Sequence, residues 1–129
     1  MLLVESELFD FLKEFYYPDL EKSKSKFATF DCVSGKQRLY IELKSRNTHY
    51  NDLLIEKMKY DAIMGAALFL GYAPSYINST PDGVWQFDLS TLPEPVWSER
   101  PLPQNTEFED RGKKNKVVGY LHIKDGVKL

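Results

Sequence analysis

The first hydrophobic positions of the chain follow the period of an α-helix. Across residues 6–17, apolar side chains recur three and four positions apart, as on a helix that packs one face against a core. The residues of this face are Leu8, Phe11, Leu12 and Phe15. Pro18 ends the helix, because the residue before a proline avoids helical backbone angles. We expect the polar residues 21–26 to form a loop.

The next segment changes from the helical period to alternation, which is typical of β-strands. Residues 27–33 and 38–45 are rich in β-branched and aromatic side chains, with a turn at residues 34–37 between them. A four-residue loop there places Val33 opposite Arg38 and Asp31 opposite Tyr40. Since side chains alternate across a sheet, one face is wholly apolar, with Ala28, Phe30, Cys32, Leu39, Ile41 and Leu43. The other face carries Thr29, Asp31, Tyr40, Glu42 and Lys44.

A long helix is predicted after this hairpin, over about residues 52–70. Asn51 or Asp52 is a suitable N-cap, and Gly71 is a suitable stop. The first half of the segment is charged and the second half is almost wholly apolar. We therefore expect the second half to be buried.

Strands and an irregular segment are expected in the rest of the chain. The predicted strands are residues 75–78, opened by Pro74, residues 84–89 after a turn at 80–83, and residues 117–123 at a sheet edge. Four of the seven prolines lie between positions 93 and 103, so residues 91–110 are expected to be extended without regular structure. Residues 111–116 are predicted to be a basic loop.

The expected order of elements is therefore α-β-β-α-β-β-β. This order predicts an α/β (α+β) fold in which a mixed β-sheet is flanked by helices. A chain of 129 residues fits one domain. Its core is expected over about residues 4–90, followed by the extended segment 91–110 and the terminal part 111–129.

Composition and charge limit the classes of function. The net charge is −2, with 17 Lys and Arg against 19 Asp and Glu, which argues against binding to nucleic acid by bulk charge alone. Cys32 is the only cysteine, so we expect neither an internal disulfide nor a structural zinc site. A single cysteine also favours a reducing compartment. The sequence has no signal-peptide pattern and no run of about 18 apolar residues. We expect a soluble, cytoplasmic protein.

Three residues on the polar face of the hairpin could form a hydrolytic site, and we call Asp31, Glu42 and Lys44 the hairpin triad. The two carboxylates come from neighbouring strands, about 7–8 Å apart on a diagonal, and could converge on one ion. Carboxylates, a backbone carbonyl and waters suit Mg²⁺ or Mn²⁺. A lysine beside such an ion could hold or help deprotonate the attacking water. The alternative is that the triad is the solvated face of an amphipathic hairpin.

The hairpin triad, with ten residues between its aspartate and its Glu-x-Lys, resembles the PD-(D/E)xK (restriction-endonuclease-like) nuclease superfamily. The stretch IELKSR at residues 41–46 is particularly similar to the small archaeal and phage Holliday-junction resolvases. The resemblance covers about residues 4–70, and Phe30 stands where the motif has proline. It implies a restriction-endonuclease-like core and a Mg²⁺ site, for which Mn²⁺ is a substitute. The metal ligands would be Asp31, Glu42, the backbone carbonyl of Leu43 and an acid of the first helix.

Glu5 is the best candidate for that helix acid, since Glu7 and Glu14 lie further toward solvent. It could equally serve only to complement the positive end of the helix, where an acid is favourable. Lys57 occupies the place of an auxiliary catalytic lysine on the second helix, on the same face as Tyr60. A solvated lysine beside a core tyrosine is the alternative.

Several polar residues could contact nucleic acid. Arg46 and Asn47 follow the motif directly and could bind the DNA backbone, whereas His49 is too isolated to be assigned as a ligand. The dense basic cluster Lys113, Lys114 and Lys116 could neutralise phosphates. A solvated loop is the usual explanation of such a lysine run.

These features together favour a metal-dependent DNA endonuclease, with branched or junction DNA as a candidate substrate. Symmetric cleavage of two strands needs two sites, so a homodimer is expected, with residues 84–89 as a candidate interface or, by default, part of the core. One alternative is a non-catalytic nucleic-acid- or protein-binding module on the same fold. Another is a RecB-like exonuclease component. The location is the host cytoplasm if the chain is phage-encoded.

Overall fold

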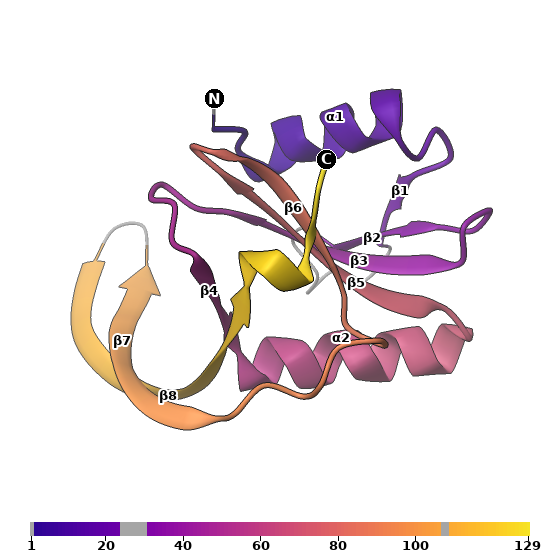
Figure 1. Cartoon of the computed structure of the whole chain (residues 1–129). Coiled ribbons are helices and arrows are strands. Elements are labelled where there is room, and N and C mark those ends of the chain that lie inside the picture. The colour runs from indigo at the N-terminus through magenta and orange to yellow at the C-terminus, as the bar shows by residue number, and fades with distance from the viewer. Residues whose placement is uncertain (1, 24–30, 107–108) are drawn as a thin grey trace.

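The computed structural model describes residues 2–23, 31–106 and 109–129 of the chain (Figure 1). The helices in these residues are α1 (Glu5–Phe15), α2 (Lys57–Leu70) and a single 3-10 turn, η1 (Ile123–Asp125). The strands are β1 (Glu21–Lys22), β2 (Asp31–Ser34), β3 (Leu39–Ser45), β4 (Asp52–Glu56), β5 (Ala73–Thr80), β6 (Gly83–Asp88), β7 (Ser98–Thr106), β8 (Glu109–His122) and β9 (Val127–Lys128). The architecture is mixed α+β, as predicted.

Within this described part, the strands form two sheets. The larger has the order β1-β2-β3-β5-β6-β9, and the smaller has the order β4-β8-β7. β3 and β5 are parallel, and α2 lies between them in the chain, while the other neighbours in both sheets are antiparallel. The larger sheet is therefore mixed, and Figure 1 shows α1 on one of its faces and α2 on the other.

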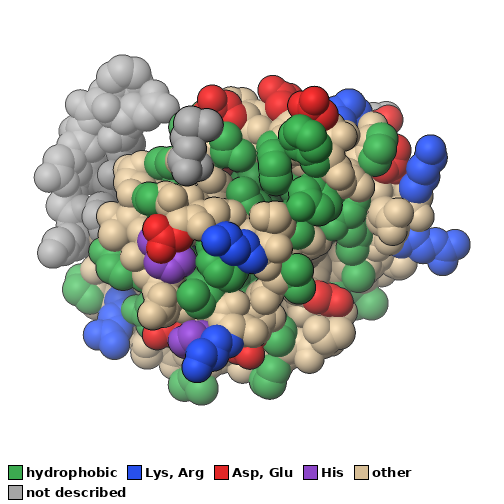
Figure 2. All heavy atoms as spheres, turned by 45° about the horizontal axis from the view of Figure 1, so that its top comes forward, with side chains coloured by type: hydrophobic (Ala, Val, Ile, Leu, Met, Phe, Trp, Pro, Cys, Tyr) green, Lys and Arg blue, Asp and Glu red, His purple; other side chains and the backbone are tan. Residues whose placement is uncertain are grey.

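α1 packs on the apolar face of the β2–β3 hairpin. Leu8 and Leu12 are fully buried there, in one cluster with Cys32, Ile41 and Leu43. The predicted helix and most of its buried face are confirmed, although the helix starts one residue earlier and ends at Phe15, whose side chain is exposed. Figure 2 turns this side of the molecule forward and shows acidic side chains gathered along the edge over α1.

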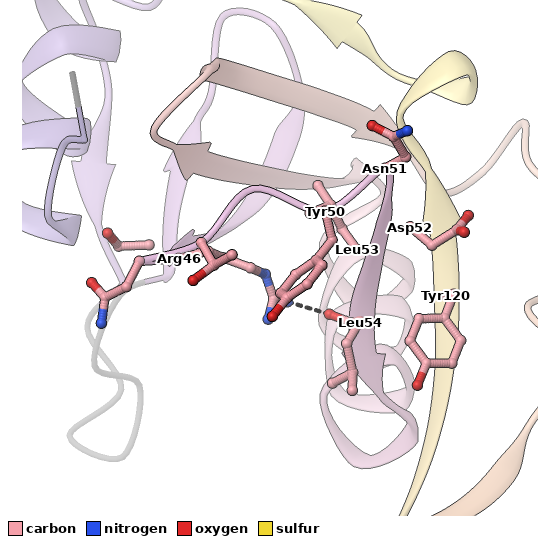
Figure 3. A pocket seen from close by; sticks show the side chains of 10 residues that line it. Arg46, Tyr50, Asn51, Asp52, Leu53, Leu54 and Tyr120 are labelled. Atoms are coloured by element: carbon pink, nitrogen blue, oxygen red, sulfur yellow. Dashed lines mark hydrogen bonds between the residues drawn. The ribbon is translucent and has the colours of Figure 1, made fainter.

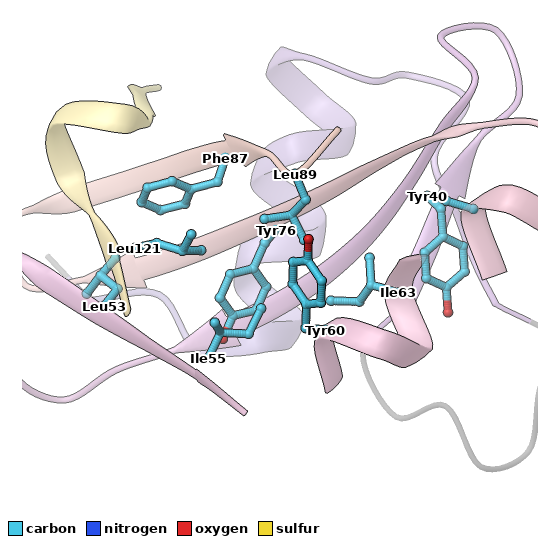
Figure 4. Close-up of a cluster of buried hydrophobic side chains, with 10 residues drawn as sticks. Tyr40, Leu53, Ile55, Tyr60, Ile63, Tyr76, Phe87, Leu89 and Leu121 are labelled. Atoms are coloured by element: carbon cyan, nitrogen blue, oxygen red, sulfur yellow. The ribbon is translucent and has the colours of Figure 1, made fainter. Parts of the chain in front are cut away.

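α2 covers the opposite face of the sheet and contributes to a second cluster of buried side chains (Figure 4). Tyr60 and Ile63 of α2 lie in it with Tyr40, Tyr76 and Phe87 of the larger sheet. Leu53, Ile55 and Leu121 of the smaller sheet complete it, so the two sheets share this core. Phe87 is fully buried, so β6 belongs to the core and not to an exposed interface.

The hairpin register differs from the predicted one by two positions. Residues 35–38 form the turn, so Asp31 pairs with Glu42 and Val33 pairs with Tyr40. The predicted pairing of Asp31 with Tyr40 was wrong because the turn begins one residue later, and Arg38 closes it at a φ of 54°. A shift of two positions keeps each side chain on its predicted face. The predicted strand residues 27–30 lie outside the described part of the chain.

The second helix is shorter than predicted. Residues 52–56 form β4 instead of its first turns, and Glu56 is its N-cap in place of Asn51 or Asp52. These residues form a strand because alternate positions, Leu53 and Ile55, are buried in the core. The strand also pairs with β8. Long-range pairing therefore outweighed local helix propensity. Gly71 stops the helix as predicted, at a φ of 72°. The expectation that the second half is buried was wrong for Leu68 and Phe69, which are 83% and 90% exposed because only one side of α2 packs on the sheet.

The C-terminal part contains more regular structure than predicted. Residues 93–97 are irregular, as expected, but β7 and β8 form a long antiparallel ribbon that includes the expected basic loop at residues 111–116. β7 contains two prolines and is an edge strand, where a missing N–H is tolerated. The predicted last strand at 117–123 is the C-terminal part of β8, which lies at the centre of its sheet and not at an edge. The predicted strands around residues 75–78 and 84–89 are confirmed as β5 and β6.

Candidate functional site

Asp31 and Glu42 lie directly opposite each other on β2 and β3. Side chains of directly paired residues are about 4.5–5.5 Å apart at Cβ, closer than the diagonal that the sequence predicted. The Glu42 side chain is only 12% exposed, and Asp31 is half-buried. Two carboxylates thus share the α2 face of the sheet in a partly desolvated position.

Lys59 of α2 brings a positive charge to this carboxylate pair. Its Nζ lies 3.6 Å from Oε1 of Glu42. Burial raises the pKa of Glu42, and the charge of Asp31 adds to this effect, while Lys59 and Lys44 lower the pKa. Glu42 is therefore a carboxylate whose charge is costly to bury and is only partly compensated by lysines.

Tyr40 fixes the other carboxylate. Its hydroxyl donates a hydrogen bond to Oδ2 of Asp31. Burial and the hydrogen bond to Asp31 raise the pKa of Tyr40, so the phenol stays protonated and remains a donor. The ring of Tyr40 is buried in the α2 cluster. A core side chain thus sets the orientation of Asp31.

The carboxylate pair borders two hollows that meet at Glu42. The first, of about 560 Å³, lies between the hairpin and α2 and is lined by Ser23, Asp31, Tyr40, Glu42, Lys59, Ala62, Ile63, Ala66, Phe69 and Leu70. The second, of about 120 Å³, is lined by Glu5, Glu42, Leu43, Lys44, Arg46, Leu54, Glu56, Lys59 and Tyr76. Both are lined by Glu42 and Lys59, so these two residues stand at the centre of the site.

The smaller hollow contains most of the residues that the sequence predicted. Glu42, Leu43 and Lys44 reach it from β3, and Glu5 reaches it from the first residue of α1. Asp31 lines the neighbouring hollow. The structure therefore brings Glu5 near the hairpin triad, whereas Glu7 is occupied in a hydrogen bond that it accepts from the backbone N–H of Val4.

Lys57 does not face these hollows. Its Nζ pairs with Oδ2 of Asp61 at 2.7 Å and lies 5.8 Å from the ring centre of Trp97. The lysine of α2 that reaches Glu42 is Lys59, which sequence reasoning missed. The helical period contained the signal, because Lys59 lies four positions before Ile63, which faces the sheet.

Arg46 is held inside the fold (Figure 3). Its Nε donates to Oδ1 of the buried Asn78 at 2.9 Å, and its Nη2 donates to the backbone carbonyl of Leu54 and to the hydroxyl of Tyr76. These bonds join β3 and β5 to the free edge of β4. The Arg46 guanidinium therefore has a structural role.

The remaining predicted binding residues are spread over the surface. Asn47 is exposed, and the His49 ring lies 2.9 Å from Oγ1 of Thr80. Lys114 is exposed on β8, and Lys116 pairs with Glu56 at 3.2 Å. The side chain of Lys113 lies outside the described part of the structure. Glu56, which also lines the smaller hollow, was not predicted from the sequence.

Cys32 is excluded as a nucleophile. It is buried under α1, and burial raises the pKa of its thiol to about 12. A thiol with that pKa has almost no thiolate at neutral pH. The expectation that Cys32 belongs to the core is confirmed.

Within residues 2–23, 31–106 and 109–129, no three His, Cys, Asp or Glu side chains converge so as to hold a metal ion together. The donors fit Mg²⁺ in a different way, since this ion is usually bound by one or two carboxylates and keeps several waters. Asp31 and Glu42 supply two carboxylates on one face, and the hollows beside them have room for water. The donor set is hard oxygen, as Mg²⁺ and Mn²⁺ require.

Neither helix in the described part of the chain has the length and apolar character that a membrane span needs. No protein-family model, curated protein or solved structure matches the chain.

Proposed function

We propose that the chain is a metal-dependent DNA endonuclease with a restriction-endonuclease-like core. The observation that carries this proposal is the direct pairing of Asp31 with Glu42, with Lys44 two residues further along the same strand. The hairpin lies between two helices in the chain, α1 and α2. This arrangement agrees with the resemblance to the nuclease superfamily. The class of substrate is a phosphodiester, with branched or junction DNA as the candidate structure.

Each residue of the site has a role in this proposal. Asp31 and Glu42 would hold the metal ion, with the backbone carbonyl of Leu43 and Glu5 as further oxygen donors. When bound, the ion supplies Lewis acidity toward the phosphate and lowers the pKa of a bound water. Lys44 orients the attacking water and stabilises negative charge on the phosphate.

Two further residues prepare the carboxylates. The Tyr40 hydroxyl holds Asp31 in one orientation through its hydrogen bond. Lys59 lies 3.6 Å from Glu42 and offsets part of the cost of burying this carboxylate in its charged form. A cation held by Glu42 would compete with Lys59 for this carboxylate.

Lysines stand beside the carboxylates of the site. Lys44, Lys59 and Lys116 lie around the smaller hollow or pair with a residue that lines it. The edge over α1, in contrast, is acidic (Figure 2). A DNA strand is therefore expected to approach along β4 and the start of α2 and to avoid the outer side of α1.

The experiment is a cleavage assay on linear, flapped, four-way-junction and closed circular DNA, with Mg²⁺ and with EDTA. We expect cleavage with Mg²⁺ only, including cleavage of closed circles, which an exonuclease cannot attack. Asp31→Asn should remove the activity and leave the circular dichroism spectrum unchanged. Cleavage that persists in EDTA or in Asp31→Asn would contradict the proposal, and activity limited to DNA with free ends would favour the exonuclease alternative.

One observation favours a second candidate, a non-catalytic nucleic-acid-binding module. The Lys59–Glu42 ion pair compensates the carboxylate without any metal. Calorimetric titration with Mn²⁺ separates the two functions. An endonuclease binds the ion, and Lys59→Gln strengthens binding by up to roughly fivefold, because an ion pair with a half-exposed lysine is worth at most about 1 kcal/mol. A binding module shows no Mn²⁺ binding in either protein.

A second copy of this chain is the partner that we propose for the outer face of α2. Met58, Ala62, Gly65 and Phe69 follow one another at helical spacing on this face, and Leu68 lies beside them. Ala62 and Phe69 also line the hollow between α2 and the hairpin, so the proposed interface borders the candidate site. Met58, Leu68 and Phe69 are 82%, 83% and 90% exposed, which for such side chains is roughly 400–500 Å² of apolar surface. That is more than half of the ~800 Å² that each partner contributes to a standard interface.

A further inference from the structure

A pocket of about 610 Å³ that no step of hydrolysis uses lies next to the candidate site (Figure 3). It lies between the β3–β4 connection and β8 and is lined by Ser45, Arg46, Asn47, Thr48, Tyr50, Asn51, Asp52, Leu53, Leu54 and Tyr120. Its volume falls in the roughly 300–1,000 Å³ range of small-molecule sites. The pocket is therefore large enough for an organic group such as a nucleobase.

Two exposed aromatic rings border this pocket. Tyr50 is 62% exposed and Tyr120 is 44% exposed, and Figure 3 shows them reaching it from different elements, with Leu54 between them. Leu54 and Tyr120 are direct cross-strand partners on β4 and β8, so their side chains lie on the same face of the smaller sheet. Neither ring belongs to either buried cluster. Their faces are thus free to contact a planar ligand.

The rest of the pocket supplies polar groups suited to the edge of a base. The exposed side-chain amides of Asn47 and Asn51 each carry a donor and an acceptor, which is the chemistry that reads base edges. Arg46 is fixed at the floor by its bonds to Asn78 and Leu54. The floor of the pocket is therefore rigid, while its rim is polar.

The pocket is continuous with the site of hydrolysis. Arg46 and Leu54 line both this pocket and the small hollow that contains Glu42 and Lys44. On the far side, Glu56 lines both that hollow and a further pocket with Lys57, Lys114 and Lys116. Leu54 and Glu56 are two residues apart on β4, about 7 Å. An aromatic pocket, the carboxylates and a group of lysines thus follow one another along one strand.

We propose that Tyr50 and Tyr120 stack an unpaired base of single-stranded DNA, and that the strand runs along β4 past Glu42 to the lysines of β8. This inference rests on the proposed function, and it narrows the substrate to DNA with an unpaired segment at the cleavage position. Aromatic rings are a general means of holding single strands, because every base has a face that stacks. The lysines at the far end of this path, Lys114 and Lys116, would meet the phosphates. A fully paired duplex cannot present a base to the pocket without unstacking it.

The test is fluorescence anisotropy in EDTA with a labelled short oligothymidylate and with an abasic strand of the same length and charge. We expect the wild-type chain to bind oligothymidylate more tightly, by roughly five- to 150-fold for each stacking ring. Tyr50→Ala and Tyr120→Ala should lower oligothymidylate binding toward the abasic level and leave abasic binding unchanged. Tyr50→Phe and Tyr120→Phe, which keep the ring, should bind as the wild type does.

Tyr16→Ala is the matched control, because Tyr16 is 41% exposed and is the C-cap of α1, away from the pocket. Equal binding of both strands by the wild type would overturn the proposal, as would an equal loss of both in the alanine variants. A measurement that needs no variant is the fluorescence of 2-aminopurine in a single strand, which stacking should quench on binding. Unchanged fluorescence at saturation would also overturn the proposal.

These measurements are independent of hydrolysis, since they are made without divalent metal. A chain that stacks bases but shows no Mg²⁺-dependent cleavage would contradict the proposed function and leave the stacking pocket standing. Mg²⁺-dependent cleavage together with equal binding of abasic and normal strands would contradict the stacking pocket and leave the proposed function standing. If both hold, Tyr50→Ala should raise KM for flapped DNA and leave kcat unchanged.

Discussion

At the scale of single residues, Glu42 connects stability and chemistry. It is nearly buried between two hollows, and burial raises its pKa. A raised pKa means that the folded state holds the proton more tightly than the unfolded chain does. The stability contributed by this group is therefore present below the ordinary carboxyl pKa and is lost as pH rises through the raised folded value.

Glu42→Gln should therefore unfold at a higher urea concentration than the wild type near neutral pH, because it removes the charge that burial disfavours. The difference should shrink as the pH falls through the raised pKa of Glu42, because the side chain then takes up a proton. Urea unfolding at the two pH values measures this, with the exposed Glu14→Gln as the control that should show no such pH dependence. A Glu42→Gln variant that is less stable than the wild type at neutral pH would mean that the Lys59 ion pair outweighs the cost of burial.

At the scale of elements, Arg46 joins the two sheets where the candidate site and the stacking pocket meet. It binds Asn78 of β5 and the backbone carbonyl of Leu54 on the edge strand β4. Burial raises the pKa of Tyr76 to about 12, so its hydroxyl stays protonated and can also donate to the Leu54 carbonyl, at 3.4 Å. The position of β4 relative to β3 thus depends on one guanidinium.

Arg46→Met should destabilise the fold by about 2–4 kcal/mol, because the buried oxygen of Asn78 and the Leu54 carbonyl lose their charged donor. Urea denaturation measures the change in the free energy of unfolding. The matched control is Arg100→Ala on the exposed side of β7, which should stay within about 0.5 kcal/mol of the wild type. A change below about 1 kcal/mol in Arg46→Met would show that the sheets are held together by their apolar core alone.

The sequence predicted those elements whose signals are local. Alternation placed Asp31 and Glu42 on one face, and the period of three and four placed Leu8 and Leu12 under α1. It did not predict that residues 52–56 form β4, because their pairing with β8 joins positions more than sixty residues apart, and no short window contains that information. The hairpin register was wrong by two positions because four-residue turns at 34–37 and at 35–38 have similar turn residues, and only packing selects between them.

The site was predicted in part for the same reason. Glu5, Asp31 and Lys44 line the two hollows that meet at Glu42, as the resemblance to the motif implied. Lys59 was not predicted, because the resemblance to the motif indicated Lys57. The side of α2 on which each side chain lies decides which lysine reaches Glu42, and that lysine is Lys59. Glu56 and Tyr120 could not be assigned, since their places depend on the second sheet.

At the scale of the whole molecule, the outer face of α2 is the clearest candidate for contact with a second copy. Phe69 is 90% exposed there, and a Cβ added at Gly65 would meet nothing within 4 Å, so nothing among the described residues requires glycine at this position. A helix-interior glycine costs about 0.5–1 kcal/mol relative to alanine, and close approach of a second helix would account for it.

Phe69→Ser should weaken self-association by roughly tenfold or more, because a large apolar side chain leaves the interface. Light scattering over a range of protein concentrations measures this. Phe15→Ser is the control, since Phe15 is 64% exposed on α1, on the other side of the sheet. A wild-type chain that stays monomeric at all concentrations would contradict the proposed interface.

The account as a whole depends on the carboxylate pair. The most direct measurement is the rate at which Glu42→Gln nicks closed circular DNA in Mg²⁺, beside the wild type and Glu14→Gln. Glutamine keeps the shape of the side chain and removes only the charge that would hold the ion. We predict a loss of at least roughly a hundredfold in Glu42→Gln, with Glu14→Gln equal to the wild type and both variants folded. Nicking by Glu42→Gln at the wild-type rate would contradict the central claim.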